Sequence, residues 1–215
     1  MRNPKSKAGF SLVELLCATA IIAILGAVAI NASAAAIEQT RSVECLSNLR
    51  QIGAAMGLYV GERNGRLPSS GHHRAEDGSS LSWTNTLADY LGTNFIGRCP
   101  AQASHPARVT YGWNDLLTEA SGENAGAGIS IALCRQPAST LVVAELATNQ
   151  TSEHFHFRGL LRNGRITYNQ FRSLVNVSVH GKSANYLFVD GHVASLPASE
   201  IQHRITPANS PLINP

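Results

Sequence analysis

The sequence is poor in charged residues, and the shortage is most complete near its beginning. Asp, Glu, Lys and Arg make up 14% of its 215 residues, and none of them lies between Leu15 and Ile30. A helix of about 20 apolar residues is long enough to cross the ~30 Å hydrocarbon core of a bilayer. Residues 10–31 therefore predict a transmembrane helix. Proline is also absent from Ala32 to Arg63, so no residue of that type interrupts a continued helix.

Beyond residue 9 the sequence has no excess of positive charge. Its formal net charge is +3, and three cations, Arg2, Lys5 and Lys7, precede Gly9 without any acidic residue. The remaining residues are therefore close to neutral, which gives no reason to expect nucleic acid as a partner. Cations before an apolar helix fit the positive-inside rule. They predict a cytoplasmic start and, in a bacterium, a head on the periplasmic side of the inner membrane.

Cysteine is scarce and lacks the spacing of a metal site. Of the four cysteines, Cys17 lies in the apolar stretch, which leaves Cys45, Cys99 and Cys134. Their spacings match no zinc-binding motif. An exported domain favours one disulfide, but three pairings are possible and the sequence selects none. A recognisable arrangement of nucleophile, base and orienting residue is also missing, so we expect neither enzymatic activity nor a cofactor.

The most specific pattern that is present runs from Lys7 to Leu16. The pair Gly9-Phe10 follows the cations, and Glu14 is a carboxylate inside an otherwise apolar segment. A charge in hydrocarbon costs at least ~2.5 kcal/mol and is rarely kept there without a partner. This pattern resembles the processing and methylation segment of type IV prepilins and type II secretion pseudopilins.

The resemblance implies a role for each of these residues. The prepilin peptidase, a membrane aspartic protease, would cleave after Gly9 and methylate the new amino terminus at Phe10. Glu14 falls on the glutamate that serves assembly in this family. The Phe10 ammonium and the Glu14 carboxylate of a neighbouring subunit would neutralise each other in the membrane, where unpaired charge is costly. We therefore expect the peptidase, other pilin subunits and the inner membrane as partners.

Two ordinary targeting segments are alternatives to this interpretation. A secretory signal peptide could be cleaved after the Ala-Ser-Ala stretch at residues 32–34, which satisfies a small-x-small rule. A signal-anchor helix could carry Glu14 incidentally. Neither alternative explains Gly9-Phe10 and Glu14 together, so we favour cleavage of residues 1–9 as a leader.

After residue 31 the pattern predicts that the helix continues and then gives way to a small head. Apolar residues from Leu46 onward step by three or four, which is the spacing of one helix face. The Asn-Gly pair at 64–65 then ends the helix. We expect residues 32–63 to pack on a head formed by residues 64–215, which contains an antiparallel sheet, in an α+β fold of the pilin type. Within the head the patterns predict a short helix over 82–91, short strands or turns at 98–101 and 111–114, strands at 140–145 and 154–157, and a hairpin turn at 162–165.

Two pairs of histidines raise the question of a metal site. His72-His73 lies in a polar loop rich in glycine and serine, where we expect solvated side chains. His154 and His156 alternate along a predicted strand and would share one face. That spacing can bind a metal ion, but no nearby carboxylate or cysteine supports one. We expect an exposed strand face there.

A second resemblance lies near the C-terminus. The sequence predicts a hairpin over residues 180–196, with a two-residue turn at Asp190-Gly191. The spacing from His180 to Asp190-Gly191 is similar to the H-X9-DG segment of prepilin-like proteins that share the N-terminal signal. Glu145 stands where that group usually has an aspartate.

His180 and Asp190 are the candidate functional pair of this segment. In an extended chain they would lie ~33 Å apart, at ~3.3 Å per residue, so they meet only if residues 181–183 bend the chain back. We expect structural roles, in which Asp190 makes the turn and His180 packs locally. The resemblance adds an alternative, a divalent cation such as calcium, because some pseudopilin heads bind it.

Together these observations predict a pseudopilin-like structural subunit that the prepilin peptidase processes and that assembles into a type II secretion-like or type IV pilus-like filament. One alternative is a minor pilin whose head binds DNA, carbohydrate or a surface. Another is a membrane-tethered, metal-dependent hydrolase that uses His180, Asp190 and either His154 or His156.

Overall fold

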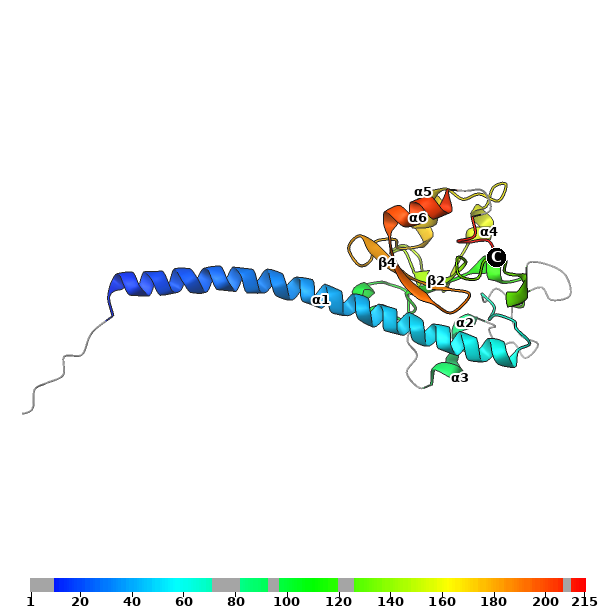
Figure 1. Cartoon of the computed structure of the whole chain (residues 1–215), viewed down its shortest axis with the longest axis horizontal. Helices are drawn as coiled ribbons and strands as arrows, with labels where there is room; N and C mark the ends of the chain where they lie inside the picture. The colour runs from blue at the N-terminus through cyan, green and yellow to red at the C-terminus, as the bar shows by residue number, and fades with distance from the viewer. Residues whose placement is uncertain (1–9, 71–81, 93–96, 120–125, 207–209) are drawn as a thin grey trace, which may run out of the picture. The chain divides into compact units, whose positions relative to one another are not determined.

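The computed structural model describes residues 10–70, 82–92, 97–119, 126–206 and 210–215, apart from the side chains of residues 28–32, 34 and 35. The chain divides into two compact units, Met1–Thr40 and Arg41–Pro215. The predicted leader, residues 1–9, and the pair His72-His73 lie outside the described residues. Of the elements named below, Figure 1 labels α1 to α6, β2 and β4.

One unbroken helix, α1 (Leu12–Glu62), accounts for the long helix that the sequence predicts. In the first unit its large apolar side chains are exposed, from 53% at Ile37 to 75% at Leu12. Among the described residues, no helix combines the length and the apolar character that a membrane crossing requires. The transmembrane span predicted over residues 10–31 is thus not shown.

In the second unit α1 buries one face only. Leu49, Ile52 and Met56 are at most 2% exposed, which confirms the predicted apolar face. The helix ends as expected, because Asn64 and Gly65 adopt positive φ angles of 52° and 76°. The Gly65 amide then donates to the carbonyl of Val60, at 3.0 Å, which satisfies one of the last carbonyls of the helix.

The head contains a five-stranded sheet in the order β3-β1-β2-β4-β5. Neighbouring strands are antiparallel except for β1 and β3, which run parallel. The α+β class is confirmed, and the one parallel pair is a feature that the sequence did not predict. The strands are β1 (Tyr111–Asn114), β2 (Leu141–Glu145), β3 (His154–Phe155), β4 (Ser183–Phe188) and β5 (Val193–Pro197).

The C-terminal hairpin is confirmed, with its turn one residue earlier than predicted. The amide of Gly191 donates to the carbonyl of Phe188, at 2.9 Å, so Val189 and Asp190 occupy the centre of the turn. Gly191 follows with a φ of 88°, a conformation that favours glycine. This is the three-residue loop with a glycine bulge, a common alternative to a two-residue loop.

Short helices occupy the connections. The helix predicted over 82–91 is divided into α2 (Trp83–Thr86) and α3 (Ala88–Leu91). The turn at 162–165 is confirmed by a bridge between Arg162 and Arg165. The others are η1 (Pro100–Gln102), η2 (Asp115–Leu117), η3 (Ile131–Leu133), α4 (Phe157–Leu160), α5 (Tyr168–Leu174) and α6 (Ala198–Ile205).

The strand predicted over 154–157 is wrong in its second half. It ends at Phe155, and Phe157 begins α4. Phe157 is fully buried and its ring stacks on Phe171 of α5, with centroids 5.5 Å apart and planes at 3°. Burying this large ring against α5 offsets the β preference of the alternating pattern.

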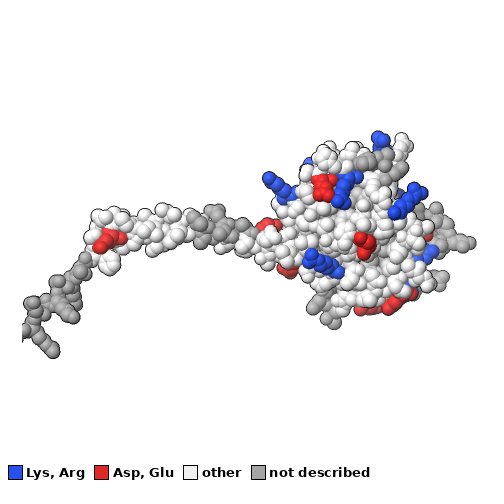
Figure 2. Space-filling model, viewed as in Figure 1, with Lys and Arg blue, Asp and Glu red and all other residues white. Residues whose placement is uncertain are grey.

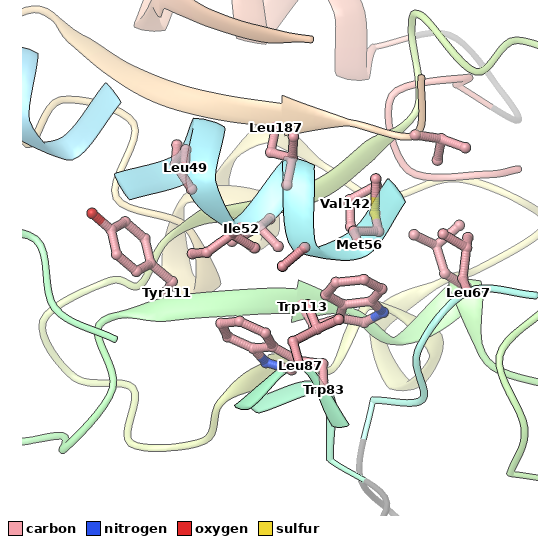
Figure 3. Close-up of a cluster of buried hydrophobic side chains, with 14 of the residues drawn as sticks. Leu49, Ile52, Met56, Leu67, Trp83, Leu87, Tyr111, Trp113, Val142 and Leu187 are labelled. Carbon is pink, nitrogen blue, oxygen red and sulfur yellow. The ribbon is translucent and has the colours of Figure 1, made fainter. Parts of the chain in front are cut away.

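The sheet has a hydrophobic cluster on each face. One cluster joins α1 to Trp113 and Leu187 of the sheet and to Trp83, and Figure 3 shows Ile52 and Met56 projecting from α1 into it. The other joins the sheet to α5 and α6, which lie on the side of the sheet away from α1 (Figure 1). Within the head, the sheet is therefore the middle layer of three.

Candidate functional site

The first helix begins with a capping box that the sequence analysis did not identify. The Glu14 amide donates to the hydroxyl oxygen of Ser11, at 3.2 Å, and the Ser11 amide donates to Oε2 of Glu14, at 2.8 Å. The two bonds satisfy two backbone donors at the helix start. Serine followed three residues later by glutamate is a readable signal for this motif. Glu14 thus has a local structural role, in addition to the assembly role implied by resemblance.

The residues that follow Glu14 form an apolar surface. Large side chains such as Leu16, Ile22 and Leu25 expose 59–68% of their surface. Figure 2 shows an almost uncharged N-terminal segment, in contrast to the charges spread over the head.

Four residues from distant parts of the sequence form a buried cluster in the head, named here the buried cluster: Cys45, Cys99, Glu145 and His180. One potential ligand atom from each lies within 4.8 Å of those of the others. Cys45 projects from α1, Cys99 precedes η1, Glu145 ends β2, and His180 precedes β4. Four separate segments of the head therefore meet at this point.

A disulfide links the first two members of the buried cluster. Cys45 and Cys99 are bonded, with Cα atoms 5.2 Å apart, and are separated by 54 positions in the sequence. This selects one of the three pairings that the sequence left open. Cys17 is exposed, and Cys134 is buried with its thiol beside the hydroxyl of Thr140, at 3.3 Å.

A hydrogen-bonded pair forms the other half of the buried cluster. Nε2 of His180 lies 3.2 Å from Oε1 of Glu145, and their side chains are only 2% and 0% exposed. The same nitrogen lies 3.7 Å from Sγ of Cys99. Oε2 of Glu145 accepts a hydrogen bond from the Asn185 amide, at 3.0 Å. The carboxylate is therefore oriented by one backbone donor, with its second oxygen facing the histidine.

The electrostatics of the buried cluster follow from its burial. Loss of solvent raises the pKa of the Glu145 carboxyl, and the hydrogen bonds from His180 and Asn185 oppose this shift. Burial also raises the pKa values of Tyr111 and Tyr186, and the nearby Glu145 charge adds to the effect.

His180 and Asp190, the candidate pair of the C-terminal segment, lie at opposite ends of β4. Gly181, with a φ of 80°, bends the chain after His180, but the six residues of β4 then lead away from it. Asp190 instead contacts His192, with Oδ1 2.6 Å from Nδ1, at the exposed turn. The carboxylate partner of His180 is therefore Glu145 and not Asp190. No spacing in the local sequence relates Glu145 to His180.

The remaining histidine pair lies together but not as a regular strand face. The rings of His154 and His156 are 4.6 Å apart, although only His154 belongs to β3 and His156 precedes α4. Their closeness follows from a short strand that turns directly into a helix. Among the described residues, the buried cluster is the group of three or more potential metal ligands.

Comparison with known proteins finds a relationship at the start of the chain. Residues 4–30 match the prokaryotic N-terminal methylation motif. The methylation motif contains Gly9, Phe10 and Glu14 and ends before the second unit begins. It supports a protein of the type IV prepilin or pseudopilin kind. No curated protein and no solved structure matches the chain, and the H-X9-DG resemblance is not shown by these comparisons.

Proposed function

We propose that the chain is a pseudopilin-like structural subunit, cleaved by the prepilin peptidase between Gly9 and Phe10 and assembled into a type II secretion-like or type IV pilus-like filament. The observation that carries this proposal is the methylation motif at the start of an uninterrupted helix of 51 residues. The proposed role is structural rather than enzymatic. Before assembly the subunit crosses the inner membrane once, with its start in the cytoplasm and its head in the periplasm.

The exposed apolar side chains of α1 support this location. Leu12, Ile22 and Leu25 are 63–75% exposed, and leaving such side chains in water forfeits about 1.5–3 kcal/mol each relative to burial. Lipid covers them before assembly, and neighbouring helices cover them in a filament. The neutral charge that remains after residue 9 gives no comparable support to a head that binds DNA.

The capping box supports a direct part for Glu14 in assembly. Oε2 accepts the Ser11 amide, and a carboxylate offers further acceptor positions on its second oxygen. The methylated ammonium of a neighbour's Phe10 would donate to Oε1. One carboxylate would then hold its own helix start and the next subunit at once.

The first test is the mass of the mature N-terminus, measured on protein recovered from membranes with and without the prepilin peptidase. We expect N-methyl-Phe10 only when the peptidase is present. A start at Ala35 would show cleavage by a signal peptidase, and an unprocessed Met1 would show a tethered head. Either of these results overturns the proposal.

Two matched variants then separate the charge of Glu14 from its capping role. Glu14→Gln keeps an acceptor for the Ser11 amide but removes the charge, whereas Ser11→Ala keeps the charge and loses one capping bond at a cost of about 1 kcal/mol. We expect filament incorporation, measured by shearing and immunoblotting, to be lost in Glu14→Gln and retained in Ser11→Ala. Loss in Ser11→Ala with normal assembly of Glu14→Gln would contradict the proposed ion pair.

A further inference from the structure

The buried cluster has a composition that a disulfide alone does not explain. A structural disulfide requires only its two cysteines and apolar surroundings, yet an acid and a histidine are buried beside this one at 0% and 2% exposure. Burying such groups is costly unless they are paired or bind a metal. The acid and the histidine are paired with each other, and the observation that remains is that this pair lies within 4.8 Å of two sulfur atoms.

We propose that reduction of the Cys45–Cys99 disulfide converts the buried cluster into a tetrahedral site for a divalent metal ion of the zinc type. The ligands are the two cysteine thiolates, Nε2 of His180 and Oε1 of Glu145. The disulfide and the metal site are then alternative states of the same four side chains. This inference concerns the head and does not depend on the filament proposed above.

The distances of the buried cluster suit such a site. Zinc binds sulfur at about 2.3 Å and nitrogen or oxygen at about 2.0–2.2 Å, so neighbouring ligand atoms of a tetrahedron lie about 3.3–3.8 Å apart. Nε2 of His180 lies 3.2 Å from Oε1 of Glu145 and 3.7 Å from Sγ of Cys99. The largest adjustment is at the sulfur atoms, which must separate from a bond of about 2.0 Å. Rotation of the two cysteine side chains provides this once the bond is broken.

The donor types select the class of metal. Thiolate and imidazole ligands suit zinc or cobalt(II), whereas calcium requires oxygen ligands. Two thiolates and one carboxylate around a divalent ion give a net charge of −1, the same as a Cys₃His zinc site. The Asn185 amide, bonded to the other carboxylate oxygen at 3.0 Å, provides the outer hydrogen bond that commonly orients a metal-binding carboxylate.

The conversion balances with a phosphine as reductant. A tertiary phosphine supplies two electrons to the disulfide and takes the oxygen atom of a water molecule, becoming a phosphine oxide. The two protons of that water molecule are transferred to the two sulfur atoms, so that both cysteines become thiols. Binding of one divalent ion then releases two protons as the thiols become thiolates. Zinc affinity should therefore rise with pH, because protons compete with the metal for the sulfur atoms.

The test uses the full-length chain in detergent, reduced with a tertiary phosphine and titrated with Co²⁺ as a spectroscopic substitute for zinc. We expect visible absorption bands of tetrahedral cobalt and a near-ultraviolet sulfur-to-cobalt band, saturating at one ion per chain and displaced by Zn²⁺. The oxidised chain should give neither band. Cys134→Ser should bind cobalt as the wild type does, whereas Glu145→Gln and His180→Ala should weaken binding by at least about tenfold.

A second measurement keeps the inference testable if those two variants fail to fold. The reduced wild-type chain is alkylated with a maleimide, with and without Zn²⁺, and the modified cysteines are mapped by mass spectrometry. Zinc should protect Cys45 and Cys99, while Cys17, which lies outside the buried cluster, reacts equally in both samples. Absence of tetrahedral cobalt bands in the reduced wild type, or equal alkylation of Cys45 and Cys99 with and without zinc, would overturn the proposal.

Discussion

Replacing both Cys45 and Cys99 with alanine removes the covalent link between α1 and the segment that leads into η1. The two residues are 54 positions apart. In the chain-entropy treatment a crosslink that closes a loop of about that length contributes about 4 kcal/mol at 25 °C, because it restricts the unfolded chain. For a unit of 150–250 residues, 1 kcal/mol changes the melting temperature by about 2–4 °C. We therefore expect the double variant to melt about 8–16 °C below the wild type.

Tryptophan fluorescence can follow this transition in the full-length chain. The sequence has two tryptophans, and Trp83 and Trp113 are fully buried and stacked in the head, with ring centroids 5.8 Å apart. The signal therefore reports on the head and not on the detergent-covered part of α1. Cys134→Ala is the matched control, because it removes a buried sulfur without removing a crosslink.

Two outcomes separate the crosslink from ordinary packing. Wild-type protein treated with a phosphine, without metal, should melt close to the double variant, since both lack the loop constraint. A double variant that melts within about 2 °C of Cys134→Ala would refute the reasoning, because the crosslink would then contribute about 1 kcal/mol or less to the free energy of unfolding.

The remaining predictions use the same fluorescence melt. Gly57→Ala should stabilise the head by about 1 kcal/mol, since alanine favours a helix more than glycine does and nothing lies within 4 Å of the added carbon. The change in the free energy of unfolding should be at least about 1 kcal/mol less favourable for Gly53→Ala than for Gly57→Ala, because the added carbon at residue 53 meets the Gly191 carbonyl oxygen at 3.2 Å. Equal effects would contradict the packing of α1 on the hairpin. Burial raises the pKa of Asp115, and the Arg158 amide, its guanidinium and a neighbouring histidine only oppose this shift. A carboxyl group whose pKa is raised in the folded state lowers the free energy of unfolding of the head as pH rises above the unfolded pKa of about 3.9. The stability of Asp115→Asn relative to the wild type should therefore increase between about pH 4 and pH 7. A difference in melting temperature that stays constant over that range would contradict a raised pKa for the buried carboxyl.

Much of the fold could be predicted because its signals are local. The absence of proline and the spacing of Leu49, Ile52 and Met56 depend only on neighbouring residues in one helix. The buried strand that became β2 is a short run of β-forming residues, and the Asn-Gly pair at 163–164 is a typical hairpin turn. Such patterns predict elements without knowledge of their partners.

The errors lie where a distant contact outweighs a local preference. The alternating histidines and phenylalanines at 154–157 favour a strand, but Phe157 stacks on Phe171, which is 14 positions away and belongs to another helix. The hairpin turn is shifted by one residue, so that Gly191 follows the two central residues of the turn and adopts the positive φ that favours glycine. Local sequence allows both turn geometries, and the strand register selects one.

The buried cluster could not be predicted from the sequence for the same physical reason. Its members come from α1, from the approach to η1, from the end of β2 and from the turn before β4, so no spacing relates them. Only the sheet register brings Glu145 beside the Asn185 amide, and only the bend at Gly181 lets His180 face it. The capping box differs, since Ser11 and Glu14 lie within one helical turn and their spacing alone indicates the motif.

The capping box gives a physical reason why Glu14 is tolerated at the edge of an apolar segment. A carboxylate that leaves water loses its hydration, and a hydrogen bond from a backbone amide restores part of it. The Ser11 amide supplies that bond from within the same helix, at 2.8 Å, before any neighbour is present. Glutamine would accept the same bond but could not neutralise an ammonium, and aspartate is one methylene shorter and departs from the Glu or Gln that a capping box uses. Glutamate at residue 14 therefore caps its own helix, and in the filament proposed above it would also supply the countercharge for the next subunit.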